Sequence, residues 1–402
     1  MKLATAFFLF LACAMALLSL ACGGSSAHTN AMTISTSGSN VQPISVNSGA
    51  NGDYANGAFT SVSVCAPGST SCQTIDNVLV DTGSSGLRIL SSALTVSLAQ
   101  QTSIDGNSVA ECLPFVSGFT WGPVQTADVQ ISGEKAPSLP LQVIGSSAFA
   151  IPAACSDQGA PMDSLAALGA NGILGIGVFA QDCGGACATT GASNPGLYYE
   201  CPASGCTVIS EALSQQVQNP VILFAQDNNG VIIELPAVTT PQVSVTGSLV
   251  FGIGTQSNNV LASATIYDVD GFGNFITTYK SVAYNQSFID SGSNGLFVLT
   301  SSLTGMPTCP DADFFYCPTS TQNFSATTEG ATNGSSGTIN FSVANADNLF
   351  NNNPSAFVFP TLAGPNSLSG FDWGLPFFFG RNVFTAVEGM QTSGGSGPYW
   401  AY

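Results

Sequence analysis

One short string occurs twice in this chain. Residues 81–90 read DTGSSGLRIL and residues 290–299 read DSGSNGLFVL, so six of the ten positions are identical and the second position keeps a hydroxyl. Each copy follows an apolar run, which places Asp81 and Asp290 at the ends of expected strands. A repeated acidic turn beyond strand-like runs indicates two copies of one supersecondary unit.

An apolar-apolar-glycine string follows each copy at a similar distance. Residues 173–175 read ILG and end 94 residues after Asp81, and residues 378–380 read FFG and end 90 residues after Asp290. The sequence therefore predicts two lobes, each carrying an acidic loop and then a matched glycine, Gly175 or Gly380.

The composition favours a mostly-β fold. The chain contains 44 Gly and 21 Pro, and short runs rich in Val, Ile, Thr and Phe are separated by turn residues. Residues 58–64 and 74–80 are predicted to form a hairpin, and residues 210–218 are a helical candidate. At 402 residues the chain exceeds a single ordinary core, so we expect lobes over residues 50–222 and 223–402.

The charge balance excludes several classes of function. Five Lys and Arg face 23 Asp and Glu, a formal net charge of −18, so nucleic acid is not an expected partner. In acid the carboxylates become neutral and few positive charges remain to repel one another. The single histidine, His28, lies in a polar Gly/Ser-rich segment, which argues against histidine-based nucleophilic or metal mechanisms.

The N-terminus has the pattern of a targeting segment. Residues 1–22 contain Lys2, an uncharged apolar run and then Cys22, which resembles a bacterial lipoprotein signal that is lipidated on this cysteine. An ordinary signal peptide cut nearby is the alternative. Residues 23–49 are expected to be a flexible tether. We therefore expect an exported protein, either lipid-anchored in the cell envelope or secreted, whose membrane contact is limited to that anchor.

The other cysteines, apart from Cys13, suggest disulfides. Their number is even and the chain is expected to be exported. Three pairs bracket Pro-containing turns, a fourth pair is close in sequence, and elimination leaves the fifth: Cys65–Cys72, Cys201–Cys206, Cys309–Cys317, Cys183–Cys187 and Cys112–Cys155. A zinc site made by Cys183, Cys187, Cys201 and Cys206 is the alternative.

Two Asp-Thr/Ser-Gly-Ser strings, the paired glycine motifs and the C-terminal string GRNVFTAVEG together resemble the pepsin-like aspartic peptidases, over residues 50–402. More narrowly, VDTGSSGLRI, GFTWGPV, NPGLYY and NGVIIELP are similar to a family of uncharacterised bacterial putative aspartic peptidases. The resemblance implies a bilobal fold with lobes related by a pseudo-two-fold axis. It also implies an endopeptidase that cleaves an extended peptide or protein substrate without metal or cofactor, and we expect a monomer.

The resemblance also implies roles for particular residues. Asp81 and Asp290 would share one proton and activate a water, which favours activity in acid. Thr82 and Ser291 would cross-brace the two loops, and a serine in each loop would bond the outer carboxylate oxygens. The supporting residues carried over by motif are Thr82, Gly83, Ser84, Ser291, Gly292 and Ser293.

Two positions depart from the family pattern. Trp121-Gly122 stands where the family has Tyr-Gly in a hairpin flap over the substrate; Trp121 is either a flap residue or a hydrophobic packing residue. Arg88 replaces an aromatic residue and either pairs with an acid near the cleft or is a structural guanidinium.

Three alternatives to a peptidase remain. The chain could be an inactive surface binding protein on the same fold or a purely structural lipoprotein, or its two acidic strings could be Asp-Gly turns that join strands.

Overall fold

Strands dominate the computed structural model, which describes residues 33–366 and 369–402. The strands are β1 (Val41–Asn47), β2 (Gly57–Cys65), β3 (Cys72–Asp81), β4 (Ser85–Leu90), β5 (Ala99–Gln100), β6 (Ser108–Phe115), β7 (Gly118–Ile131), β8 (Glu134–Ile144), β9 (Gly172–Ile176), β10 (Tyr198–Cys201), β11 (Thr207–Val208), β12 (Gly230–Leu235), β13 (Val245–Phe251), β14 (Ile266–Asp268), β15 (Phe275–Tyr279), β16 (Val282–Ile289), β17 (Leu296–Val298), β18 (Gln322–Glu329), β19 (Ser336–Val343), β20 (Ala363–Pro365), β21 (Asp372–Trp373), β22 (Arg381–Ala386), β23 (Gln391–Thr392), β24 (Gly395–Ser396) and β25 (Tyr399–Ala401).

Helices are short and few in the described ranges. The α-helices are α1 (Ala153–Ser156), α2 (Leu165–Leu168), α3 (Ser301–Thr304) and α4 (Ala346–Asn352), and the 3₁₀ turns are η1 (Ser91–Ala93), η2 (Gly184–Ala186), η3 (Leu213–Gln215), η4 (Pro220–Leu223) and η5 (Leu375–Phe378). The mostly-β prediction is confirmed. The helix expected over residues 210–218 is wrong: only η3 forms there, because Gln216, Val217 and Gln218 are buried in extended chain rather than presenting one helical face.

One arrangement of three strands occurs in each half of the chain. In the N-terminal half β9 pairs in parallel with β3 and antiparallel with β4. In the C-terminal half β21 pairs in parallel with β16 and antiparallel with β17. Each acidic loop therefore leaves the end of a strand that is flanked by a later, parallel strand. The predicted duplication of one supersecondary unit is confirmed.

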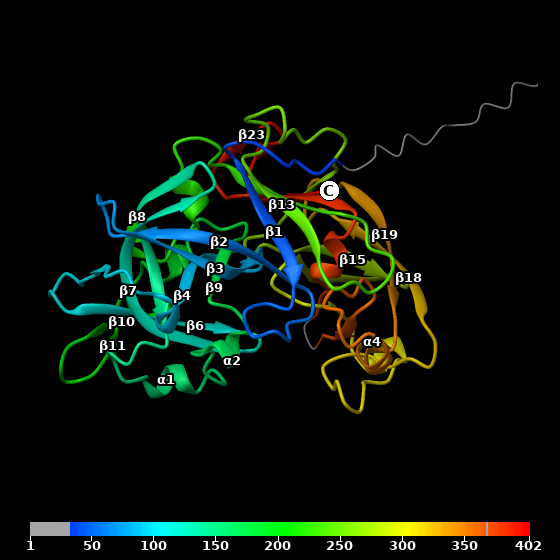
Figure 1. Ribbon diagram of the computed structural model, residues 1–402, viewed down its shortest axis with the longest axis horizontal. Helices are drawn as coiled ribbons and strands as arrows, with labels where there is room; N and C mark the ends of the chain where they lie inside the picture. The colour runs from blue at the N-terminus through cyan, green and yellow to red at the C-terminus, as the bar shows by residue number, and fades with distance from the viewer. Residues whose placement is uncertain (1–32, 367–368) are drawn as a thin grey trace, which may run out of the picture. The chain divides into compact units, whose positions relative to one another are not determined.

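Strand β1 joins the two halves. It pairs antiparallel with β2 on one side and with β13 on the other, and Figure 1 shows it between these strands, with blue-to-green strands to one side and yellow-to-orange strands to the other. The expected tether over residues 23–49 is thus wrong from Ser35 onward, since the Ser35 N–H donates to Glu234 Oε2 at 2.6 Å and Asn40 is buried. Val41, Ile44 and Val46 are buried, and the sheet supplies backbone partners that a tether would lack.

All five predicted disulfides are present, and they indicate folding in an oxidising compartment. The zinc alternative is wrong, because its four cysteines form two of these disulfides and offer no thiolates. The predicted hairpin is also confirmed, since β2 pairs with β3 and Cys65 lies opposite Cys72.

The expected signal segment, Cys22 and His28 lie outside the described residues. No helix within the described ranges is long and apolar enough to cross a bilayer.

Candidate active site

The two acidic loops begin at equivalent points of the duplicated unit. Asp81 is the last residue of β3 and lies opposite Gly175 of β9 in the parallel ladder. Asp290 directly follows β16, and its N–H donates to the carbonyl of Trp373 in β21 at 3.2 Å. The strand residues next to each loop are buried: Val80 and Leu174 in the first half, Ile289 and Trp373 in the second. Each loop therefore starts from the core.

The glycine that matches Gly175 is Gly374, not Gly380 as the sequence spacing predicted. A Cβ on Gly175 would lie 2.8 Å from Ser84 Oγ, and a Cβ on Gly374 would lie 2.7 Å from the Ser293 carbonyl oxygen. Gly380 instead has a φ of +78° beyond η5. The parallel register decides this, because it places the string Asp372-Trp373-Gly374 beside the second acidic loop.

Thr82 and Ser291 bind the two loops to each other. The Thr82 N–H donates to Ser291 Oγ at 3.1 Å, and the Ser291 N–H donates to Thr82 Oγ1 at 2.9 Å. Each hydroxyl then donates to a carbonyl of the opposite strand, that of Ile289 at 3.1 Å or that of Val80 at 2.7 Å. This is the cross-brace implied by the resemblance, and it holds four buried polar groups in one reciprocal network.

The carboxyl groups of Asp81 and Asp290 are held in matching ways. Gly83 N–H donates to Asp81 Oδ1 at 2.8 Å, and Ser84 Oγ donates to Asp81 Oδ2 at 2.5 Å. In the second loop, Gly292 N–H donates to Asp290 Oδ1 at 2.7 Å. Ser293 Oγ lies 2.7 Å from Asp290 Oδ2. The outer oxygen of each carboxyl therefore faces a serine, as the resemblance implied.

The glycines let the two carboxyls approach each other. A Cβ on Gly83 would lie 2.6 Å from Asp290 Cγ, and a Cβ on Gly292 would lie 2.7 Å from Asp81 Oδ1. Any side chain at either position would push the opposite carboxyl away. Glycine at both positions therefore follows from the geometry of the pair.

Asp81 and Asp290 interact strongly. Burial raises the pKa of Asp81 to about 8, and the charge of Asp290 and a hydrogen bond between the two side chains act in the same direction. Asp81 is only 7% exposed. The negative charge of Asp290 therefore opposes ionisation of Asp81. Such a pair has a base and an acid side by side.

Sequence reasoning missed a third carboxyl at this site. Asp372 of β21 is buried, and its Oδ2 lies 2.6 Å from Ser293 Oγ. Burial and the charge of Asp290 raise the pKa of Asp372 well above its ordinary value. The available signal is an acidic residue inside the apolar string FDWG, but spacing along the chain favours the string FFG instead.

Tyr54, in the β1–β2 connection, was also missed. Burial first, and then the charges of Asp290 and Asp81, raise the pKa of its phenol. Its ring packs edge-to-face on Phe59 at 5.4 Å, and a Cβ on Gly169 would lie 2.4 Å from that ring. Tyr54 is therefore a neutral hydroxyl in the electrostatic environment of the pair. Its surrounding turn sequence, NGDYANG, carries no signal for this role.

The hairpin expected to carry the flap is formed by β6 and β7, but Trp121 is packed within it. Its indole N–H donates to the Phe149 carbonyl at 3.2 Å, and its ring meets Tyr199 edge-to-face at 5.3 Å. Trp121 is 3% exposed beside Cys112 and Cys155. These contacts agree with the interpretation of Trp121 as a hydrophobic packing residue rather than as a flap residue. Position 122 has no room for a side chain, because a Cβ on Gly122 would lie 1.9 Å from the Val143 carbonyl oxygen.

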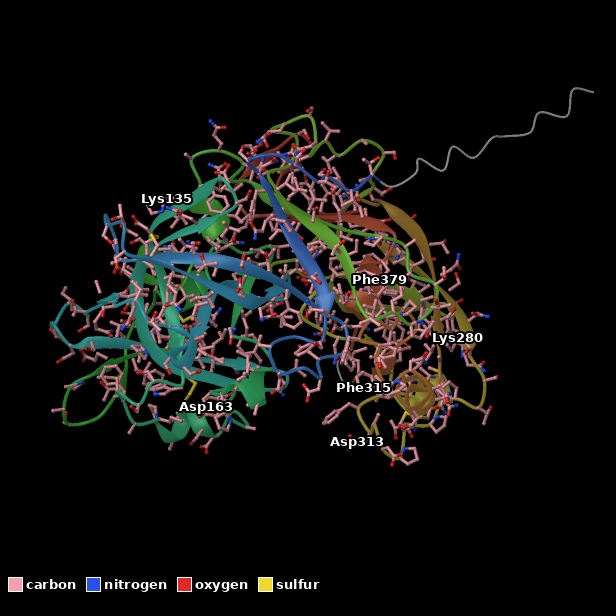
Figure 2. All side chains as sticks on the ribbon, in the orientation of Figure 1. Lys135, Asp163, Lys280, Asp313, Phe315 and Phe379 are labelled. Atoms are coloured by element: carbon pink, nitrogen blue, oxygen red, sulfur yellow. A yellow bond between two sulfur atoms is a disulfide. The ribbon has the colours of Figure 1, made fainter. Side chains whose placement is uncertain are left out.

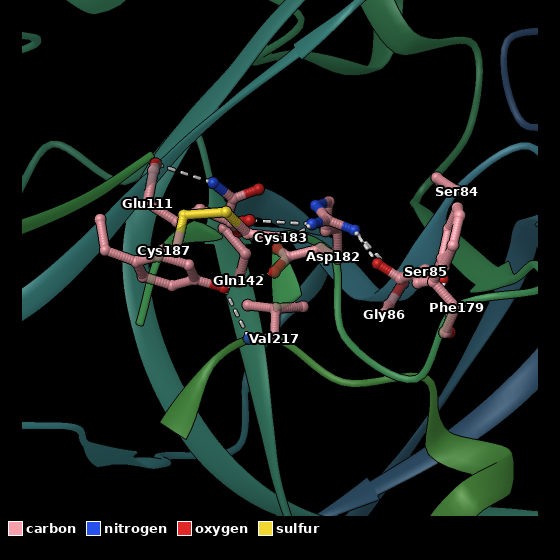
Figure 3. Close-up of polar contacts among 12 residues, drawn as sticks. Ser84, Ser85, Gly86, Glu111, Gln142, Phe179, Asp182, Cys183, Cys187 and Val217 are labelled. Atoms are coloured by element: carbon pink, nitrogen blue, oxygen red, sulfur yellow. Dashed lines mark hydrogen bonds and ion pairs between the residues drawn. A yellow bond between two sulfur atoms is a disulfide. The ribbon is translucent and has the colours of Figure 1, made fainter. Parts of the chain in front are cut away.

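The guanidinium of Arg88 is buried and hydrogen-bonded to the end of the first acidic loop. Its Nη2 lies 2.9 Å from Glu111 Oε1 and 2.8 Å from Asp182 Oδ2, and its Nη1 donates to the Ser85 carbonyl at 2.8 Å (Figure 3). Tyr198 donates to Asp182 Oδ1 at 2.7 Å. Burial, and then the charge of Glu111, raise the pKa of Asp182 well above its ordinary value.

Within residues 33–366 and 369–402, no close group of three potential metal ligands includes Asp81 or Asp290. Among the described residues, the one close group of three is Cys309, Cys317 and Asp347, and its two cysteines are joined in a disulfide. A disulfide sulfur is not a thiolate ligand, so this group does not fit a metal.

Comparison with solved structures identifies the fold. The aspartic proteinase from Irpex lacteus has a similar structure, with a TM-score of 0.51 and 15% sequence identity; the match covers 90% of this chain and 96% of that chain. The protein thus has a mostly-β, bilobal pepsin-like fold. It belongs to the DUF3443 family, described as proteins of unknown function, whose model matches residues 36–402. No curated protein matches the chain.

Proposed function

We propose that this protein is an aspartic endopeptidase that uses Asp81 and Asp290 to hydrolyse peptide bonds. The observation that carries the proposal is the pair itself: two carboxyls on loops braced by Thr82 and Ser291, close enough that the charge of Asp290 helps to raise the pKa of Asp81. A surface binding protein does not need two carboxyls held this close, because their proximity destabilises the ionised state without contributing to binding.

The chemistry follows from the shared proton. The ionised carboxylate takes a proton from a water molecule as the water oxygen attacks the scissile carbonyl carbon. The protonated carboxyl donates its proton to the carbonyl oxygen, which gives a neutral tetrahedral intermediate. Proton transfer to the amide nitrogen then accompanies cleavage of the C–N bond and releases an amine and a carboxylic acid. No metal or cofactor takes part in these steps.

The substrate would be an extended peptide or an unfolded protein segment. The setting we propose is the exported face of a bacterial cell envelope, with the chain anchored through lipidated Cys22 and acting as a monomer. Replacement of Cys22 by Ala, followed by fractionation of the cells, tests the anchor: the protein should move from the membrane fraction to the soluble fraction.

The first experiment is cleavage of a denatured protein substrate from pH 3 to pH 8, with and without a pepstatin-type inhibitor. Asp81→Asn and Asp290→Asn should each lose roughly 10³-fold or more in rate, and Asp313→Asn, at an exposed position, is the matched control. Folded wild-type protein that cleaves nothing at any pH would refute the peptidase and favour the binding protein on the same fold.

A further inference from the structure

Ser293 is shared by two carboxyl groups. Its Oγ lies 2.7 Å from Asp290 Oδ2 and 2.6 Å from Asp372 Oδ2. A serine hydroxyl carries one hydrogen and can donate to only one of these oxygens. The other contact is a hydrogen bond only if the carboxyl itself brings the proton, since two lone pairs would otherwise meet at hydrogen-bond distance.

The surroundings identify Asp372 as the carboxyl that brings the proton. Its Oδ1 is buried without a hydrogen-bond partner in the described part of the chain. An ionised carboxylate in that position would lack the donors that stabilise buried charge, whereas a neutral acid leaves only a carbonyl oxygen unpaired. Asp290, in contrast, already accepts from the Gly292 N–H.

The charged groups around Asp372 act in the same direction. The ionisable side chains that shift it are Asp290, on the loop after β16, and Asp81, on the loop after β3. Within residues 33–366 and 369–402, Asp372 forms no ion pair with a Lys or Arg side chain. Two neighbouring carboxyls and no paired cation favour the neutral form.

In the described part of the chain, the first loop has no such third carboxyl. Asp372 lies opposite Phe288 in the parallel ladder, and the matching position opposite Leu79 is Ile173. Ser84 therefore has Asp81 as its carboxyl partner, while Ser293 has two. The two halves of the pair are held by equivalent backbone but by unequal proton networks.

We propose that Asp372 is a positioning residue that stays protonated in the folded protein and donates a hydrogen bond to Ser293, which in turn donates to Asp290. This relay makes Asp290 the ionised member of the pair and leaves the shared proton on Asp81. The catalytic consequence rests on the proposed function: Asp290 would accept the proton from water and Asp81 would protonate the carbonyl oxygen. The proton on Asp372 itself does not depend on that function.

The pH dependence of thermal unfolding tests the proton on Asp372 without any need for activity. The unfolded chain loses this proton near pH 4, whereas the folded protein keeps it at higher pH. Wild type should therefore lose stability relative to Asp372→Asn as the pH rises above about 4. Asp313→Asn, at the exposed position labelled in Figure 2, should follow wild type. Parallel curves for wild type and Asp372→Asn from pH 4 to pH 8 would overturn the proposal.

The pH profile of cleavage tests the relay to Asp290. Asp372→Asn keeps the shape and offers an amide donor to Ser293, while Asp372→Ile copies the first lobe and removes the donor. The acid limb should move up by about 0.5–1 pH unit in Asp372→Ile, because Asp290 loses a polarised hydrogen bond, and should move less in Asp372→Asn. Ser293→Ala breaks the same relay and should shift the limb in the same direction.

The two measurements separate the two proposals. If wild type cleaves nothing but its stability curve diverges from that of Asp372→Asn, the peptidase is refuted and the proton on Asp372 stands. If wild type cleaves and the acid limbs of Asp372→Ile and Ser293→Ala coincide with the wild-type limb, the relay is refuted and the peptidase stands.

Discussion

Thr82 and Ser291 exchange hydrogen bonds across the junction of the two acidic loops, each through its own N–H and the hydroxyl of the other, at 3.1 Å and 2.9 Å. Their sequence separation is 209 residues, so this contact forms only when both halves of the chain have folded. The brace couples the position of Asp81 to that of Asp290.

The brace predicts a difference between two small changes at position 82. Thr82→Val keeps the shape but leaves the Ser291 N–H buried without its acceptor, which should destabilise the protein by about 1–3 kcal/mol. Thr82→Ser keeps the hydroxyl and should stay within about 1 kcal/mol of wild type. Urea unfolding monitored by tryptophan fluorescence measures both. Equal stability of the two variants would show that the hydroxyl is not needed for the brace.

The close approach of the loops predicts that Gly83→Ala disrupts the pair. The new Cβ would lie 2.6 Å from Asp290 Cγ, so the two carboxyls must separate. A displacement of about 1 Å at reacting groups can lower the rate roughly 10²-fold. Steady-state cleavage of a peptide substrate checks this. Gly271→Ala is the control, because its Cβ would meet no atom within 4 Å. A fully active Gly83→Ala protein would contradict the geometry.

The raised pKa of Asp81, about 8, predicts how stability and activity depend on pH. In the unfolded chain this group ionises near its ordinary value of 3.8, so the folded state binds the extra proton between those two values. Its contribution to stability is complete below pH 3.8 and is lost as the pH rises towards 8. Asp81→Asn should flatten this decline in melting temperature.

Activity should be lost over the same alkaline range, because loss of the shared proton removes the acid of the pair. A pH profile of kcat/KM whose alkaline limb lies near 8 would agree with this. A melting temperature that declines equally in wild type and Asp81→Asn would place the proton elsewhere.

The network around Arg88 predicts a large and local effect on stability. Arg88→Met would leave Glu111 and Asp182 buried without their cation, and breaking a buried ion pair from one side costs about 3–5 kcal/mol. Lys135→Met is the control, since the lysine side chain is 48% exposed (Figure 2). Its partner Asp128 is buried but keeps the N–H donors of Gly68 and Ser138, so about 1 kcal/mol or less is expected there. Chemical denaturation compares the two. Similar losses in both variants would show that burial of Arg88 adds nothing.

The features that depend on residues close together in the chain could be predicted from the sequence. The two acidic strings stand next to apolar runs, and the residues that fill each loop are consecutive, so Asp81, Asp290 and their serine and glycine neighbours could be predicted together. Four of the five disulfides bridge eight residues or fewer, and the fifth, Cys112–Cys155, followed by elimination. The mostly-β fold follows from short β-branched runs between turns.

Tertiary structure decided the features that depend on which strands pair. The sequence predicts a tether where β1 forms, because the short apolar pattern of this segment becomes significant only beside β2 and β13. Gly374, rather than Gly380, matches Gly175 because the parallel ladder of β16 and β21 sets the register, and spacing along the chain does not. Asp372 reaches Ser293 through that same ladder, 79 residues away in sequence. Parallel pairing joins segments through long connections, so a sequence can show that a carboxyl exists but only the folded sheet shows which hydroxyl it meets.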